Sequence, residues 1–315
     1  LTRLDITRVL ATTGIVLDMP SEQPPVDRDS SAPDPESLTP SELLRSGNPV
    51  LIERALIGPQ EWSIEDLPHL VPLLARDGWL GPAVRALAAF GVEAVPYLSS
   101  VLGDDSADFV LRRRIPRVLE LIDHPDADQA LVNALGAGRF EVRYRVALAL
   151  YHRRLESLPM SSGDWESEVW AAVNAQLSRE KPVWELARLL DAEADDGFVE
   201  RRVGLRGELS LEHTFRLLSL VLDRDTVRAA YHGIILNDPE LKSFALEYLE
   251  QVLPRNVRDR LWPFIGDLSA SAEQRALRNL DDVVADLLLS GATLFGSQED
   301  REALRRYLDE TTDRP

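Results

Sequence analysis

Apolar residues recur at steps of three and four along most of the chain, as they do along one face of an α-helix. The clearest example is LNDPELKSFALEYLEQVLP, which runs from Leu236 to Pro254. Asp238 and Pro239 form a helix start signal, and Pro254 stops the helix. The apolar stripe between them consists of Leu241, Phe244, Ala245, Tyr248, Leu249 and Val252. Because a lone helix of this length is marginal in water, we expect the stripe to be buried against neighbours.

We expect this helix to lie between two others, over residues 226–235 and 257–265, with Phe244, Leu246 and Leu249 as packing residues. Its acids are expected to face solvent: Glu240, Glu247 and Glu250. The sequence therefore predicts one member of a stacked series of helices.

The same period predicts helices along the rest of the chain, separated by short breaks that contain Gly, Asp, Asn or Pro. Up to residue 154 they are Pro49–Leu56, Ile64–Ala75, Pro82–Phe90, Ala94–Leu102, Phe109–Ile122, Asp126–Leu135 and Phe140–Arg154. Beyond it they are Trp165–Leu177, Val183–Leu190, Leu211–Leu222, Thr226–Ile235, Leu241–Val252, Val257–Ile265, Ala272–Leu289 and Gln298–Leu308. We expect a long connection up to Ser210, before the helix that begins at Leu211. No stretch alternates convincingly with period two, so the fold is predicted to be all-α.

Composition divides the chain into four parts. Residues 1–17 are expected to form a short N-terminal helix or strand. Residues 18–40 are rich in Pro, Ser and acids, which is typical of a flexible linker. Residues 41–269 hold the helical array, with an irregular insertion near 155–210, and residues 270–315 hold capping helices and a frayed tail.

An internal repeat specifies how the helices are arranged. Four helices begin with an aliphatic residue followed by arginine, at Val84–Arg85, Leu111–Arg112, Val142–Arg143 and Val227–Arg228. The first two steps between the aliphatic positions are 27 and 31 residues. Helix pairs repeated at this spacing predict an α-solenoid of stacked antiparallel helix pairs, in which each pair buries its stripe against the next.

The stretch from Gly81 to Asp267 resembles HEAT-type repeats of bacteria. The segments that carry the resemblance are LRRRIPRVLELI, FEVRYRVALALYHRR, TFRLLSLVLDRDTVRAAYHGI and DPELKSFALEYLEQVLP. The combination is also similar to the helical-repeat region attached to bacterial membrane proteins akin to nucleotide transporters. That resemblance implies a cytoplasmic regulatory module, sometimes beside a cyclic-nucleotide-binding domain, and tethered to the membrane through a domain outside this sequence. Since the chain begins with Leu1 rather than Met, we expect it to be a fragment or a processed form.

Charge and composition narrow the choice of partner. The chain has 35 Lys and Arg against 53 Asp and Glu, a net charge of -18, which disfavours nucleic acid and anionic membranes. It has no cysteine, which suits a reducing, cytoplasmic setting. No uncharged apolar run reaches the ~18 residues that a membrane helix needs, so no membrane insertion is expected within this segment.

The sequence offers no grouping that supports catalysis. Its histidines do not form an H-x-x-x-H pair, and no P-loop, G-x-G-x-x-G or G-x-S-x-G motif is present. The acids around His124, in DHPDAD, lack the glycine and glutamate of a calcium loop and are typical of helix caps. We therefore predict a protein that is not an enzyme and uses no metal or cofactor. A lyase function, found in some HEAT-like proteins, has no residues here on which to place its chemistry.

The arginines of residues 112–154 are the main candidate for a binding site, because guanidinium groups pair bidentately with carboxylates and phosphates. The candidate partner-binding residues are Arg112, Arg113, Arg117, Arg143, Arg145 and Arg153. An alternative explanation is that these arginines pair with aspartates inside the array. The sequence leaves two hypotheses about function. The first hypothesis is a noncatalytic scaffold that binds a protein partner or another domain of its own polypeptide. The second is a nucleic-acid-binding or DNA-glycosylase-like HEAT protein that uses the same arginines.

Overall fold

The computed structural model describes residues 38–57, 62–153, 165–191, 198–236 and 238–266. The chain divides into two compact units, Leu1–Thr39 and Pro40–Pro315, and the elements described below belong to the second unit. The predicted segments 1–17 and 270–315, with helices 272–289 and 298–308, lie outside the described residues, as does most of the predicted linker.

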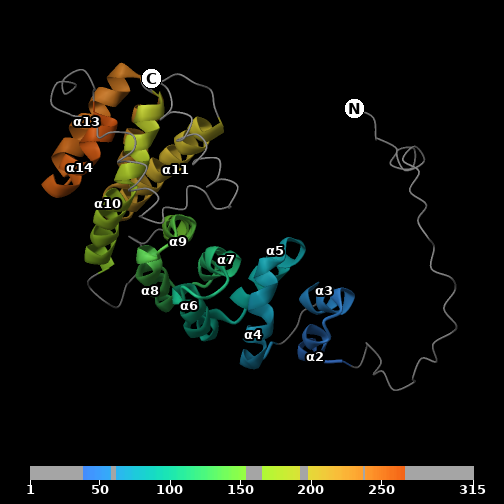
Figure 1. Ribbon diagram of the computed structural model, residues 1–315. Helices are drawn as coiled ribbons and strands as arrows, with labels where there is room; N and C mark the ends of the chain where they lie inside the picture. Colours follow the sequence, from blue (N-terminus) through green and yellow to red (C-terminus); the bar gives the residue numbers. More distant parts are fainter. Residues whose placement is uncertain (1–37, 58–61, 154–164, 192–197, 237, 267–315) are drawn as a thin grey trace, which may run out of the picture. The chain divides into compact units, whose positions relative to one another are not determined.

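Every element in the described part of the chain is helical, which confirms the all-α prediction (Figure 1). The α-helices are α2 (Pro40–Arg45), α3 (Pro49–Ile57), α4 (Leu67–Leu70), α5 (Leu80–Ala88), α6 (Val95–Gly103), α7 (Phe109–Leu119), α8 (Pro125–Asn133), α9 (Phe140–Arg153), α10 (Trp165–Asp191), α11 (Phe198–Val221), α12 (Arg224–Leu236), α13 (Pro239–Val252) and α14 (Arg255–Ile265). Short 3-10 segments connect several of them, at Ile64–Asp66, Val71–Ala75, Asp77–Trp79, Gly91–Ala94 and Ala134–Gly136.

Most helices lie close to their predicted bounds, but the helix predicted over 64–75 is broken. It consists of the single α-turn α4 between two 3-10 segments. Pro68 and Pro72 lie four residues apart in this stretch, and neither can donate a backbone hydrogen bond. A regular α-helix is therefore interrupted on both sides of α4, while Leu67, Leu70 and Leu74 remain buried.

Two predictions between residues 165 and 210 are wrong. The helices predicted over 165–177 and 183–190 form one helix of 27 residues, α10, with Pro182 inside it. The connection expected up to Ser210 is helical from Phe198 onward, since α11 begins there. Gly204 and Gly207 indicated a break, but glycine costs a helix only about 1 kcal/mol, which packing against α9 and α10 offsets.

From α5 to α11, helices contact the second helix along the chain as well as near neighbours. Helix α7 contacts α5 and α9, and α9 also contacts α11. On the other side α8 contacts α6 and α10. Each helix from α5 to α9 places fully buried leucine or isoleucine between these contacts: Leu87, Leu98, Leu102, Ile115, Leu119, Leu131 and Leu150. Burying each such side chain stabilises the fold by roughly 1.5–3 kcal/mol.

Helix α13 packs as predicted against α12 and α14, but one of its expected packing residues does not. Leu249 is fully buried and Leu246 is half-buried, whereas Phe244 is 70% exposed. The buried side of α13 runs through Ala245 and Leu249, where α12 comes close: a Cβ on Gly233 would meet the carbonyl oxygen of Leu241 at 2.8 Å. Phe244 lies off that side, so its prediction as a packing residue was wrong.

No single helix in the described ranges is long and apolar enough to cross a membrane. Two consecutive stretches, Asp77–Ala88 and Gly91–Gly103, meet that criterion only jointly, and they are bent by 116°.

Candidate functional site

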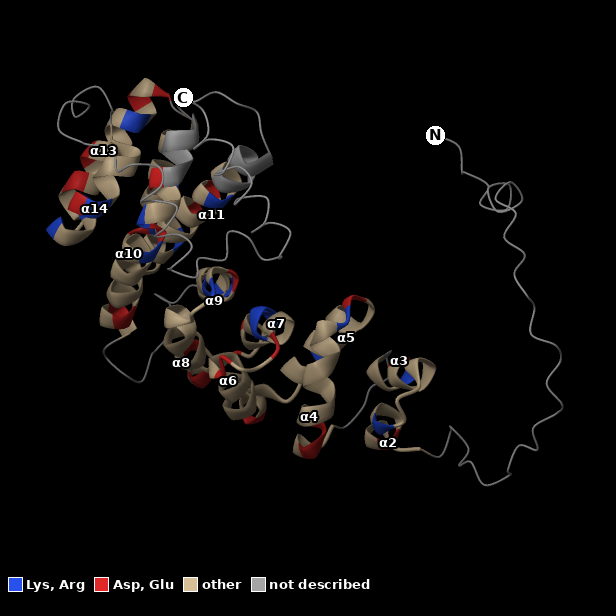
Figure 2. Cartoon of the chain, in the orientation of Figure 1, with Lys and Arg blue, Asp and Glu red and all other residues tan. Residues whose placement is uncertain are grey.

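Five arginines line one hollow of about 640 Å³ that α5, α7 and α9 form together. They are Arg85, Arg113, Arg114, Arg117 and Arg145, and we call the feature the arginine hollow. Glu120 is the one acid in its lining. Figure 2 shows Lys and Arg on α7 and α9, the two helices that supply most arginines of this hollow.

The local sequence of α7 explains why two of its arginines, Arg113 and Arg117, lie on the side away from the core. Asp108 caps the helix by accepting a hydrogen bond from the Val110 amide at 2.6 Å. Ile115 and Leu119 are fully buried, so the opposite face carries Arg113 and Arg117, four residues apart. Like charges at this spacing repel each other, which costs the free helix a few tenths of a kcal/mol.

Most of the arginines of the hollow form no ion pair with the described residues. Arg114 is the exception, because it pairs with Asp77 and donates a hydrogen bond to the Leu74 carbonyl at 2.6 Å. Glu120 is itself engaged, since its Oε1 lies 2.9 Å from Nδ1 of His152. Among the described residues no ion pair involves the other four arginines, although the Arg113 guanidinium lies 5.6 Å from the centre of the Phe109 ring.

The six predicted binding residues therefore separate into two groups of three. Arg113, Arg117 and Arg145 lie together in the arginine hollow. Arg112, Arg143 and Arg153 point into the protein, where their side chains are only 5%, 5% and 7% exposed. Arg112, Arg143 and Arg153 therefore follow the alternative explanation, in which the arginines pair with acids inside the array.

Arg112 and Arg153 each hold a carboxylate and backbone carbonyls from neighbouring segments. Arg112 pairs with Asp105 at 2.6 Å and donates to the Leu102 carbonyl at 3.1 Å. Arg153 pairs with the fully buried Asp128. It also donates to the carbonyls of Glu120 and Ile122, at 2.9 and 2.7 Å. These contacts satisfy backbone carbonyls at the C-terminal ends of α6 and α7, which lack helical partners.

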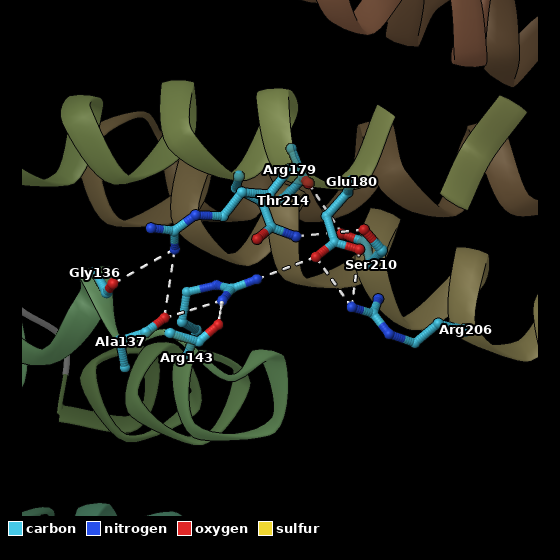
Figure 3. A network of polar contacts seen from close by, with 10 residues as sticks. Gly136, Ala137, Arg143, Arg179, Glu180, Arg206, Ser210 and Thr214 are labelled. Carbon is cyan, nitrogen blue, oxygen red and sulfur yellow. Dashed lines mark hydrogen bonds and ion pairs between the residues drawn. The ribbon is translucent and has the colours of Figure 1, made fainter. Parts of the chain in front are cut away.

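Arg143 belongs to a buried network that joins α9, α10 and α11 (Figure 3). It lies 3.1 Å from Glu180, and the same carboxylate lies 2.8 Å from Arg206. Arg143 also donates to the carbonyls of Ala137 and Gly138, at 2.9 and 2.8 Å. Burial lowers the pKa of Arg143 to about 10, so it stays charged at neutral pH. We call these three charged residues the Glu180 network.

Sequence reasoning missed Arg85 and Arg114 as members of the hollow, and Glu180 and Arg206 as members of the network. The sequence did point to Arg85, because it belongs to one of the repeated aliphatic–arginine pairs. Nothing in the sequence pointed to Arg206, because residues 198–210 were expected to form a connection between helices.

A second hollow, of about 390 Å³, adjoins the first. Helices α9, α11 and α12 line it, and Leu148 and His152 belong to both hollows. Its lining includes Tyr151, Phe215 and Tyr231, so we call it the aromatic hollow. Burial, with further effects of Glu212 and Glu208, raises the pKa of Tyr231 to about 12, which keeps its hydroxyl neutral.

His213 is buried, and its ring meets the ring of Phe140 edge-on, with the two ring centres 5.6 Å apart. Burial, together with Arg143, Arg216 and Arg206, holds the pKa of His213 well below its usual 6.5. The folded state therefore excludes a proton that the unfolded chain binds below pH 6.5, so the free energy of unfolding must fall as pH drops through that range.

We expect that free energy to fall by about 1.4 kcal/mol between about pH 7.5 and about pH 5.5 through His213 alone. Urea unfolding at the two pH values measures it. The substitution His213→Gln should remove this part of the pH dependence, whereas His69→Gln, at an exposed position, should leave it intact. An unchanged pH dependence in His213→Gln would contradict the assignment.

The described residues contain no group of three or more His, Asp or Glu side chains that could hold a metal ion. Comparison of the chain with protein-family models, with curated proteins and with solved structures gave no match.

Proposed function

We propose that this chain is a noncatalytic interaction module with a HEAT-like α-solenoid fold. In this arrangement α5, α7, α9 and α11 form one layer, and α6, α8 and α10 form the other. The contacts of helices with their second neighbours support it, since stacked helix pairs must touch in this way. The layer of α5, α7 and α9 then presents the arginine hollow as its binding surface.

We propose further that the hollow binds an acidic segment of a protein partner, or of another domain of the same polypeptide. One observation carries the proposal: four arginines share a concave surface without any ion pair among the described residues, in a chain of net charge -18. In so acidic a protein, internal carboxylates were available to neutralise them, as they neutralise Arg112, Arg143 and Arg153. A carboxylate from outside would form charge-assisted hydrogen bonds worth roughly 1.5–3 kcal/mol each.

A short acidic segment suits this surface better than nucleic acid does. The hollow has a local excess of positive charge, with five arginines and one acid in its lining, and a duplex that extended beyond it would meet a chain of net charge -18. The resemblance to repeat regions of transporter-like membrane proteins adds a proposed setting. There the module is cytoplasmic, is tethered through a domain outside this sequence, and regulates that domain.

Fluorescence anisotropy with two labelled ligands tests the proposed function. One ligand is an oligoglutamate peptide, and the other is a DNA duplex. We expect the peptide to bind, with an affinity that falls as salt rises, and the duplex to bind more weakly. Tighter binding of the duplex would favour the nucleic-acid alternative. If neither ligand binds at low salt, the proposed function is wrong.

A further inference from the structure

We infer that the segment bound by the arginine hollow carries an aromatic side chain beside its acidic residues, and that this side chain enters the aromatic hollow. The inference rests on the proposed function and specifies its ligand. The ligand would then be recognised by two features, its acidic residues and its aromatic side chain, and not by negative charge alone.

The two hollows adjoin each other along α9. Leu148 and His152, one turn apart on α9, belong to the lining of both. A peptide in the arginine hollow that continues along α9 therefore passes directly into the aromatic hollow. His152 stands at the junction and is held by Glu120 at 2.9 Å.

The chemistry of the lining changes at this junction. On one side the lining is dominated by guanidinium groups. On the other side the lining holds the aromatic residues Tyr151, Phe215 and Tyr231, Arg216 paired with Glu212, and a second arginine, Arg228. With two arginines and one acid there, against five arginines and one acid in the arginine hollow, an acidic side chain meets less positive charge in the aromatic hollow. Rings that meet in offset or edge-to-face contact add about 0.5–1.5 kcal/mol to the burial of an aromatic side chain.

Contacts within the protein hold the aromatic lining in place before any ligand binds. Phe215 is buried, and its ring centre lies 5.2 Å from that of Tyr231. The Arg224 guanidinium lies over the ring of Tyr151 at 3.6 Å. A hollow of about 390 Å³ with such walls lies within the size range of sites that take small apolar groups.

A peptide series tests the inference. Each peptide carries the same oligoglutamate stretch, followed or preceded at increasing spacing by tryptophan, and each has a partner with alanine in place of tryptophan. At the best spacing we expect the tryptophan peptide to bind at least about tenfold more tightly than its alanine partner.

The substitution Tyr151→Ala should reduce this advantage and leave the affinity for the alanine peptide unchanged. The alanine peptide thereby reports that the variant is folded and that its arginine hollow is intact. Equal affinities at every spacing would overturn the inference and leave the proposed function standing. A tryptophan advantage that survives Tyr151→Ala would place the aromatic side chain elsewhere, which also overturns it. If neither peptide binds, the proposed function itself fails.

Discussion

Replacing Glu180 by glutamine is expected to lower the free energy of unfolding by about 3–5 kcal/mol, because the change leaves two buried guanidinium groups without a counter-charge. Arg143 and Arg206 both pair with this one carboxylate, at 3.1 and 2.8 Å, and their side chains are 5% and 9% exposed. Since the carboxylate joins α9, α10 and α11, its loss weakens the contact between three helices at once.

Urea-induced unfolding measures this effect, and the same helix offers a matched control. Glu168 is exposed on α10, so Glu168→Gln removes an equal charge and should change the free energy of unfolding by less than about 0.5 kcal/mol. Equal stabilities of the two variants would mean that the Glu180 network contributes nothing to the fold.

The double substitution Arg113→Glu and Arg145→Glu is expected to weaken the binding of the oligoglutamate peptide by at least about 100-fold. Each change removes one charge-assisted contact and places a like charge against the ligand. Neither arginine has an ion pair among the described residues, so the substitutions remove no ion pair within that part of the chain. We therefore expect binding to fall while the free energy of unfolding stays nearly constant.

The control for this prediction alters net charge by the same amount away from both hollows. Arg54 is exposed on α3, and Arg255 is exposed on α14. The double substitution Arg54→Glu and Arg255→Glu should retain most of the affinity. If both double variants lose affinity equally, the attraction comes from overall charge and the arginine hollow is not the site.

The period of apolar residues was enough to predict most helices, because each stripe must be buried against a neighbour. It failed where local signals and packing disagree. Gly204 and Gly207 favour a break, yet α11 runs through both because α9 and α10 pack against it. It also failed at Phe244, where apolar character predicts burial but the neighbouring helices lie on another side of α13.

The position of each arginine relative to the apolar stripe of its helix could have separated the buried arginines from those of the hollow. Arg112 stands three residues before the buried Ile115 and seven before the buried Leu119, so it lies on the apolar stripe of α7. Arg153 stands three residues after the buried Leu150 and is likewise on the stripe of its helix. Arg113 and Arg117 lie off the stripe, which is why they face the hollow.

The convergence of three helices on one hollow could not be predicted in the same way. Arg85 and Arg145 lie far apart in the sequence, and only the packing of α5, α7 and α9 brings their helices together. The aromatic hollow depends on α11 and α12 as well, and half of α11 was expected to be irregular.

The most direct test of the central claim is site-specific photo-crosslinking of the oligoglutamate peptide. Leu121 lines the arginine hollow and is 55% exposed, whereas Leu241 lines neither hollow and is 50% exposed. A photoreactive phenylalanine analogue placed at each position samples two surfaces of similar exposure and the same residue type. We predict that the bound peptide crosslinks at position 121 and not at position 241. Binding without a crosslink at position 121, or with equal crosslinks at both positions, would contradict the assignment of the arginine hollow as the binding site.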